Sequence, residues 1–222
     1  MAGTTGLDGL DAEAARAWLL AAAAAVEASA ERLTELDAAI GDGDHGANLR
    51  RGFRAVVAAL DGAELPTPGA VLAKAGMTLI SSVGGASGPL YGSAFRAMGK
   101  ALNPPGAAPV EAPADAGQVA AALTAGLEAV QRLGAAQLGD KTMVDAWAPG
   151  AEAFGAAADQ GPARAAEAAA EAAEAGALAT VPLQARKGRA SYLGERSIGH
   201  QDPGATSTAL LFRTLADVLA KG

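Results

Sequence analysis

Apolar residues recur along this chain at helical spacing, and short polar or glycine-rich stretches separate the apolar segments. No stretch alternates apolar and polar residues for long enough to predict a β-sheet. The pattern therefore predicts an all-α protein of eight helices, the sixth of them interrupted or bent at an internal proline. The expected ranges are Asp8–Asp37, Gly46–Leu60, Gly69–Ser82, Pro89–Leu102, Gly117–Leu133, Thr142–Ala158, Pro162–Ala179 and Ala205–Ala220.

Helix-start and loop signals support several of these boundaries. Pro162 suits the first position of the seventh helix, and Asp202 followed by Pro203 suits the cap and first residue of the eighth. Asp140 is expected to cap the sixth helix. The segment Asn103–Ala116 contains four prolines and is predicted to be a loop.

Helical spacing also predicts which faces are buried at the two ends of the chain. The expected buried side of the first helix comprises Leu10, Ala14, Ala17, Trp18, Ala21 and Ala25. The expected buried side of the last helix comprises Leu211, Leu215 and Val218.

Composition agrees with a helical fold and sets the domain count. The chain of 222 residues is half apolar but only 4% aromatic, and alanine is abundant. Residues 1–222 are expected to form one domain, in which small side chains let helices pack closely in an antiparallel bundle. Alternate connections of such a bundle share one end, so several glycine-rich connections are expected to gather at one rim. These connections are Gly41–Gly46, Gly84–Gly88, Gly134–Asp140 and Gly188–Gly204.

Charge and the absence of cysteine narrow the function classes. The formal net charge of −7 disfavours a non-specific nucleic-acid binder, which needs a positive surface. Without cysteine there is no disulfide and no thiolate metal site. The longest apolar run, Ala17–Val26, is too short to cross a bilayer, and acidic residues replace the basic start of a signal peptide. We expect a cytoplasmic protein with neither a nucleic-acid nor a membrane partner.

Three carboxylates, Asp37, Asp42 and Asp44, surround two glycines after the first predicted helix. Like charges at this spacing repel one another unless a cation compensates them. Oxygen-only ligands suit Mg²⁺, which commonly binds carboxylates together with substrate phosphates. Gly41 and Gly43 would let the backbone turn sharply enough to bring the carboxylates together. The loop predicts a magnesium site.

The residues of this loop also fit a bland interpretation and a misleading motif. A solvated acidic turn with a helix cap remains open from the residues alone. The string Gly41–Gly46 also matches the dinucleotide-binding pattern G-x-G-x-x-G, but that pattern requires a preceding strand, and a long helix is predicted here.

Further segments could bind phosphate. The glycine-rich stretch Gly84–Gly88 leads into a helix and would expose several amide donors. The segment Gln184–Ser207 concentrates four basic residues in an acidic protein, which is compatible with phosphate neutralisation or with a solvated patch. The stretch Gly134–Thr142 resembles a P-loop only loosely, since Asp140 precedes the lysine and no strand is predicted before it.

The motifs Leu36–Asn48, Gly76–Gly88, Gly139–Asp145 and Gln184–Ser207 together resemble the L subunit of bacterial dihydroxyacetone kinases. The resemblance implies an eight-helix antiparallel barrel-like bundle with a nucleotide at one end. It implies that Asp37, Asp42 and Asp44 hold two Mg²⁺ ions on the phosphates of ADP or ATP. The implied nucleotide-binding residues are His45, Gly46, Ala47, Asn48, Ala86, Ser87, Gly134, Met143, Arg189, Asp202, Pro203 and Gly204. Among them, Gly134 and Met143 would frame the base.

The resemblance also implies a division of labour. A separate K subunit would bind the keto-triose covalently through a histidine, and this chain would donate the phosphoryl group. Both histidines here, His45 and His200, lie inside nucleotide-site motifs, so the substrate histidine would belong to the partner. The Asp-His-Gly form of the acidic loop is similar to the branch in which bound ADP is rephosphorylated by a phosphohistidine carrier of the phosphotransferase system.

Alternatives within and outside the family stay open at this point. The chain could serve an ATP-dependent keto-sugar kinase, or act as a nucleotide-loaded module that regulates a partner protein. A third interpretation is an acidic helical scaffold without a ligand. The resemblance also implies a possible homodimer within the kinase complex.

Overall fold

The structure is a computed structural model that describes residues 7–103 and 112–221. These residues form eight α-helices and two 3-10 segments, and their one extended pairing is an isolated bridge between Leu10 and Ala114. The helices are α1 Ala12–Ile40, α2 His45–Leu60, α3 Pro68–Ser82, α4 Ser87–Leu102, α5 Ala116–Gly134, α6 Val144–Ala156, α7 Pro162–Ala179 and α8 Pro203–Leu219. The 3-10 segments are η1 Ala158–Gln160 and η2 Arg189–Ser197.

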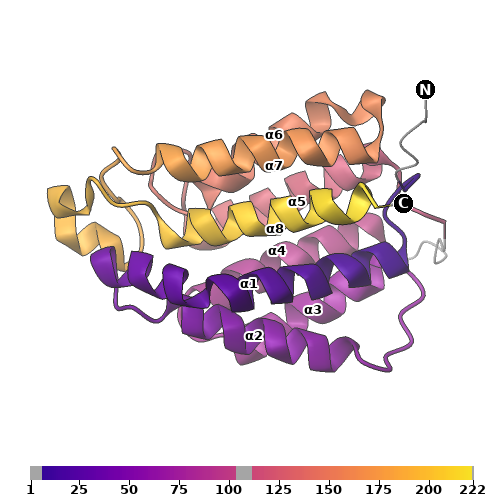
Figure 1. Ribbon diagram of the computed structural model, residues 1–222, viewed down its shortest axis with the longest axis horizontal. Helices are drawn as coiled ribbons and strands as arrows, with labels where there is room; N and C mark the ends of the chain where they lie inside the picture. The colour runs from indigo at the N-terminus through magenta and orange to yellow at the C-terminus, as the bar shows by residue number, and fades with distance from the viewer. Residues whose placement is uncertain (1–6, 104–111, 222) are drawn as a thin grey trace.

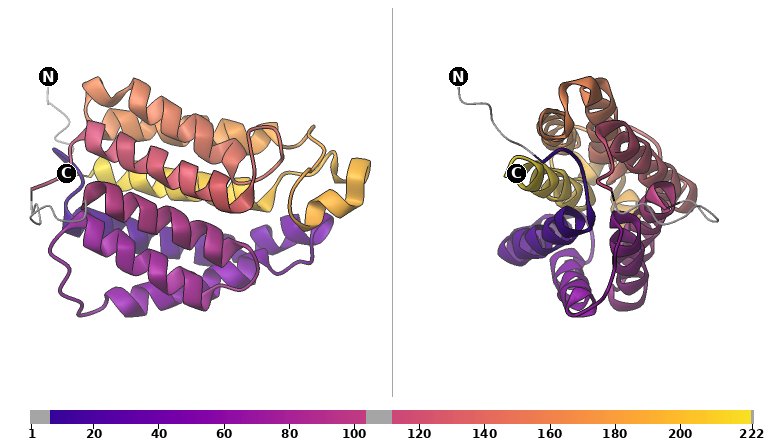
Figure 2. Two further views of the ribbon diagram at one scale, coloured as in Figure 1. Left: turned by 180° about the vertical axis from the view of Figure 1, so that it is seen from behind. Right: turned by 90° about the vertical axis from the view of Figure 1, so that its right-hand side faces the viewer.

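The eight helices close into a ring. Each helix packs against the next one in the chain, and α8 packs against α1. The helices run side by side along the long axis, joined at alternate ends, and the end-on view shows the ring (Figures 1 and 2). The prediction of an all-α, eight-helix antiparallel barrel is confirmed. None of the described helices is both long and apolar enough to cross a bilayer.

The core is built from aliphatic and aromatic side chains and from alanine. Trp18 and Phe95 pack at a centroid distance of 5.6 Å, and Trp147 meets Phe212 edge-on at 5.8 Å. The α7 helix buries a stripe made entirely of alanine, so neighbouring helices approach it closely.

The predicted buried face of α8 is confirmed, because Leu211, Leu215 and Val218 are all buried. The predicted face of α1 was partly wrong. Leu10, Ala14 and Trp18 are buried, but Leu10 precedes the helix, and three of the expected alanines lie at its half-buried edge. Alanine signals burial weakly, so it could not fix the rotation of the helix. The buried side continues instead through Ala15, Leu19, Ala22 and Val26.

Four of the eight described helices, α1, α3, α5 and α8, begin with a side-chain cap. Asp11 accepts a hydrogen bond from the Ala14 amide at 2.7 Å, and Asp202 accepts one from the Ala205 amide at 2.7 Å. Asp115 forms a reciprocal capping box with Gln118 at the start of α5. The cap and first residue predicted for the last helix are therefore confirmed.

The prediction that Asp140 caps the sixth helix was wrong. The α6 helix begins at Val144, and Asp140 accepts instead from the Gln137 amide at 3.0 Å. Asp145, in the first turn of α6, stabilises the preceding turn instead. Its two carboxylate oxygens accept from the Gly139 amide at 2.6 Å and the Thr142 amide at 2.7 Å. The cap thus comes from inside the helix rather than from before it.

Two further predictions concern a proline helix and a proline loop. The α6 helix runs without interruption through Pro149, so the proline does not break it. Residues 104–111 of the predicted loop lie outside the described residues. Its described remainder leads into α5, which begins at Ala116.

Candidate metal and nucleotide site

A cavity of about 280 Å³ opens at one end of the barrel. Its walls come from the connections after α1, α3 and α5, from the start of η2 and from the start of α8. The prediction that the glycine-rich connections gather at one rim is confirmed. The segment between α7 and α8, residues 180–202, projects beyond the helix ends on this side (Figure 1).

The three predicted metal ligands lie together at the rim of this cavity. One carboxylate oxygen from each of Asp37, Asp42 and Asp44 lies within 4.8 Å of the other two. Asp37 is half-buried, while Asp42 and Asp44 are exposed. The set is all oxygen and carries three negative charges, which is the donor chemistry that Mg²⁺ prefers. The residues present therefore fit a divalent cation.

Hydrogen bonds fix the most buried of these carboxylates. One oxygen of Asp37 accepts from the Asp44 amide at 2.8 Å and from the His45 amide at 3.1 Å. Asp37 thereby caps α2 from the end of the preceding helix, since the side chain of Asp44 makes no cap bond. The same two hydrogen bonds therefore shape the acidic loop and orient the Asp37 carboxylate.

Two glycines make this loop sterically feasible. A Cβ on Gly41 would lie 2.2 Å from the other oxygen of Asp37, so any side chain there would displace the carboxylate. Gly43 has a φ of +73°, which L side chains rarely adopt. The sharp turn predicted from these two glycines is confirmed.

An ion pair crosses the cavity mouth. The Nε of Arg189, at the start of η2, lies 3.0 Å from a carboxylate oxygen of Asp42. Both side chains are well exposed, at 70% and 37%, so the pair contributes little to stability. It does bring the basic C-terminal segment against the acidic loop, as a phosphate site built from both would require.

A buried hydroxyl network joins the N-terminal two turns of α2, α4 and α8. The two ring nitrogens of His45 lie 3.1 Å from Ser87 Oγ and 2.9 Å from Ser207 Oγ. The hydroxyl of Tyr91 lies 2.7 Å from Ser207 Oγ and 2.8 Å from Thr208 Oγ1. Three helix N-termini, each with a partial positive charge, are thus held around one cavity.

Burial governs ionisation in this network. It lowers the pKa of His45, an effect that the nearby Asp37 and Asp44 oppose. Burial also raises the pKa of Tyr91, although bonds from Ser207 and Thr208 oppose this. Both side chains are therefore neutral near pH 7 and serve as hydrogen-bonding groups.

Asp202 is the buried counterpart of the exposed carboxylates. Burial, the largest cause, together with Asp145 and Asp37 raises its pKa to about 7, although the Ala205 amide and Lys141 oppose the shift. Its own amide donates to Thr180 Oγ1 at 2.9 Å, which ties the start of α8 to the end of α7. The same residue thus caps a helix and lines the cavity.

Residues 39–217 of the chain match the family model of the DAK2 domain. The chain belongs to the DAK2 domain family. It is 45% identical over 188 residues to the Lactococcus lactis protein named "PTS-dependent dihydroxyacetone kinase, ADP-binding subunit DhaL", covering 85% of this chain and 88% of that one. It is 44% identical over 201 residues to the Escherichia coli "PEP-dependent dihydroxyacetone kinase, ADP-binding subunit DhaL", covering 90% and 93%.

Solved structures resemble this DAK2 domain over nearly its whole length. The native dihydroxyacetone kinase of C. freundii aligns with a TM-score of 0.71 and 29% identity, covering 98% of this chain. The same kinase in complex with AMP-PNP and Mg²⁺ aligns with a TM-score of 0.69. This chain covers only 36% of the C. freundii chain, so it corresponds to one part of that kinase.

Most residues predicted for the site line the cavity of this DAK2 domain. Those that do are Asp37, Asp42, Asp44, His45, Ala86, Ser87, Gly134, Met143, Arg189, Asp202, Pro203 and Gly204. Gly46, Ala47 and Asn48 are not among the lining residues. Gly46 packs against α1, where a Cβ would lie 1.9 Å from the Ala30 carbonyl oxygen. The Asn48 side chain accepts from Arg51 at 2.8 Å.

The first-turn amides of α2 can still serve an anion. Gly46 and Ala47 are the second and third residues of the helix, so their N–H groups have no acceptor within it. The roles predicted for these two residues need only the backbone.

Several lining residues were missed from the sequence. Tyr91, Lys141 and Thr142 line the cavity, together with apolar side chains from α1, α4 and α5. Tyr91 follows Ser87 by one helical turn, which could have indicated that both face the same way. Its bonds to Ser207 and Thr208, more than 100 positions away, leave no signal in a single sequence.

Proposed function

We propose that this chain is the nucleotide-binding, phosphoryl-donating subunit of a dihydroxyacetone kinase that depends on the phosphotransferase system. The observation that carries the proposal is the convergence of a three-carboxylate cluster and three helix N-termini on one cavity. Relatives alike over 85–90% of this chain are named as ADP-binding subunits of such kinases. The proposal takes residues 1–222 as one nucleotide-binding domain.

The acidic loop is proposed to hold the metal. Asp37, Asp42 and Asp44 would bind two Mg²⁺ ions, whose chemistry is to neutralise nucleotide phosphates and polarise the phosphoryl group for transfer. Asp37 is already oriented by two amide N–H groups, and one of its oxygens lies within 4.8 Å of an oxygen of each of the other two carboxylates. Asp42 would exchange its partner Arg189 for metal, which frees the guanidinium to meet phosphate.

The phosphates are proposed to lie where the helix N-termini meet. The first turn of α2, the Ser87 hydroxyl with the Ala86 backbone, and the turn Asp202–Gly204 would supply the donors. Gly134 and Met143 are proposed to frame the base, since Met143 is buried and a thioether packs well on an aromatic ring.

The keto-triose is proposed to be bound by a partner. Both ring nitrogens of His45 already face serine hydroxyls, so this histidine is not free to form a bond to a sugar carbonyl. A K subunit would carry the substrate and the general base, and a phosphohistidine carrier would recharge the bound nucleotide. A homodimer within this complex and a cytoplasmic location are further expectations of the proposal.

Reconstitution tests the proposal directly. Native mass spectrometry of freshly purified protein should find retained ADP with two magnesium ions. Supplying a K subunit, a phosphorylated carrier and dihydroxyacetone should then yield dihydroxyacetone phosphate. Turnover with added ATP but not with the carrier would replace the proposed donor by ATP. No association with magnesium and either adenine nucleotide in calorimetry would refute the proposal.

A further inference from the structure

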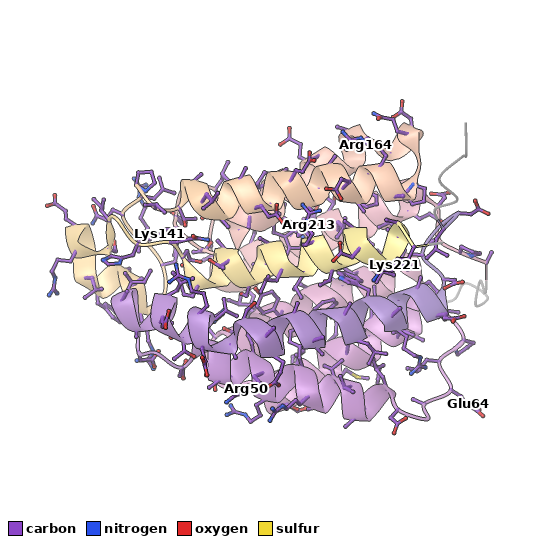
Figure 3. All side chains as sticks on the ribbon, in the orientation of Figure 1. Arg50, Glu64, Lys141, Arg164, Arg213 and Lys221 are labelled. Atoms are coloured by element: carbon purple, nitrogen blue, oxygen red, sulfur yellow. The ribbon has the colours of Figure 1, made fainter. Side chains whose placement is uncertain are left out.

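Lys141 lies at the cavity end of the barrel (Figure 3). The residue is almost completely buried, with 1% of its surface exposed. Its ammonium donates to the carbonyl oxygens of Thr180 at 2.9 Å, Leu183 at 3.1 Å and Ser197 at 2.8 Å, and also to that of His200. An ammonium has three N–H groups, so these four acceptors use all of them. Lys141 has no donor left for a phosphate.

All four carbonyls belong to the α7–α8 connection, residues 180–202. The connection has little apolar burial of its own: along η2 only Ser197 is buried. The neighbouring Asp140 carbonyl adds one more tie by accepting from the Arg186 amide at 3.0 Å. Residues 140 and 141 therefore fasten this connection to the α5–α6 turn at five points.

The backbone at Lys141 is shaped for this contact. Its φ is +62°, which is uncommon for a residue with a side chain. Asp145 supports the turn by accepting from the amides of Gly139 and Thr142 on either side. Burial lowers the pKa of the lysine, while Asp202 and Asp145 oppose this effect and favour the charged form.

The α7–α8 connection carries two of the predicted site residues, Arg189 and Asp202. Arg189 lies at its outer part, paired with Asp42, and Asp202 lies at its last position, capping α8. Asp202 is tied to the same place as Lys141, because its amide bonds the Thr180 hydroxyl while Lys141 bonds the Thr180 carbonyl. The position of both site residues depends on how this segment is held.

We propose that Lys141 is a positioning residue, whose ammonium fastens the α7–α8 connection to the α5–α6 turn and so holds Arg189 and Asp202 against the nucleotide cavity. This inference rests on the proposed function for what the cavity binds. The hydrogen bonds from the Lys141 ammonium to the four carbonyls do not depend on that function.

The first experiment uses the wild-type protein and needs no nucleotide. The chain has five lysines, and an exposed ammonium exchanges its protons with water too quickly to be seen near neutral pH. With ¹⁵N-labelled lysine, one protected ammonium resonance is expected, and it should be absent from Lys141→Met. A spectrum without any protected ammonium would overturn the clamp.

The second experiment compares Lys141→Met with Lys100→Met, a matched change at an exposed lysine on α4. Unsatisfied carbonyls and a loosened connection should weaken Mg²⁺–ADP binding by roughly tenfold to a hundredfold in Lys141→Met only. Amide hydrogen exchange should rise in residues 180–202 and stay unchanged in the core of α1, α3 and α4. Wild-type affinity in Lys141→Met, or an increase spread evenly over all helices, would overturn the positioning role.

A chemical rescue separates position from general stability. The chain contains no cysteine, so Lys141→Cys can be alkylated at a single site while unfolded and then refolded. Bromoethylamine restores an ammonium on a side chain of lysine length, whereas iodoethane leaves a neutral one. Affinity and local exchange should recover with the first reagent only, and equal recovery with both would contradict the proposal. If native wild-type protein bound no Mg²⁺–ADP, the proposed function would fail, while the protected ammonium resonance would still test the clamp.

Discussion

The two walls of the cavity use the same residue type in opposite ways. On the α1–α2 side, Asp42 and Asp44 are exposed and crowd against Asp37. On the α7–α8 side, Asp202 is buried, accepts a helix-capping bond and sits near a buried lysine. Exposed carboxylates stay solvated, so a cation can replace their water at little cost. The buried one has lost its water already and works through fixed hydrogen bonds.

The two walls therefore have different roles: one binds the ligand, and the other holds the site residues in position. The acidic wall supplies charge that a ligand must neutralise, and mutations there should cost activity without costing stability. The buried wall supplies position, and mutations there should change stability together with affinity. The following variants test this division, beginning with the largest expected effect.

Asp44→Asn should reduce phosphoryl transfer by roughly a thousandfold or more, since removing a metal ligand forfeits several kcal/mol of charge stabilisation. The fold should survive, because Asp44 is exposed and its side chain makes no cap bond. The measurement is reconstituted turnover beside a thermal melt, with Tm expected within about 2 °C of wild type.

Glu64→Gln is the matched control for this variant, because Glu64 is an exposed carboxylate at the far end of the barrel (Figure 3). It should change neither quantity. Near-wild-type turnover in Asp44→Asn would remove Asp44 from the ligand set.

Asp202→Asn should change how stability depends on pH. A carboxyl whose folded-state pKa is raised to about 7 binds its proton more tightly in the folded protein. Its contribution to stability is present below about pH 4 and is lost as the pH rises to about 7. Asparagine still caps the helix, but it does not ionise and therefore adds no pH dependence to the stability. The variant should therefore gain stability relative to wild type, by up to about 4 kcal/mol, between pH 4 and pH 8.

Urea unfolding of both proteins across this pH range measures the difference. Subtracting the two curves removes the contribution of every other titrating group. Parallel curves would mean that Asp202 ionises in the folded protein as it does in the unfolded chain.

Tyr91→Phe should cost about 1–2 kcal/mol of unfolding free energy, because it leaves buried hydroxyls of Ser207 and Thr208 with one partner fewer. Nucleotide affinity should fall only a few-fold, since His45 keeps both serine contacts. Denaturant unfolding and calorimetry measure the two effects. A large loss of affinity at unchanged stability would instead make Tyr91 a direct ligand.

Arg189→Gln should have the smallest effect on stability, below about 0.5 kcal/mol, because its ion pair with Asp42 is solvent-exposed. If Arg189 meets phosphate, ADP affinity should fall by about tenfold, and the loss should shrink at high salt. Calorimetry at two ionic strengths checks this. A salt-independent loss would point to a packing role for Arg189 instead.

The sequence predicted the fold well where a local signal sufficed. The range of α7 was predicted correctly to the residue, because Pro162 marks its first position and alanine favours its interior. The acidic loop could be predicted because its glycines and carboxylates are neighbours in the chain. The cap of α6 was predicted wrongly because Asp140 and Asp145 are equally plausible until the left-handed turn at Lys141 is known.

The rest of the site depends on contacts between distant segments. Nothing near Lys141 in the sequence indicates that its partners lie 39 to 59 positions ahead. The hydroxyl network likewise requires that the starts of α2, α4 and α8 meet, which follows only from closing the ring. The predicted ligand roles themselves stay predictions.

Closure of the ring also determines at which end of the barrel a label or surface can be attached without blocking the cavity. The Leu7 amide bonds the Leu219 carbonyl at 3.2 Å, so both ends of the described chain meet at the end of α8. The other end of that helix lines the cavity, about 25 Å away for a helix of this length. A fluorophore, affinity handle or sensor surface attached at either end of the described chain would thus hold the barrel with its open mouth turned toward solution.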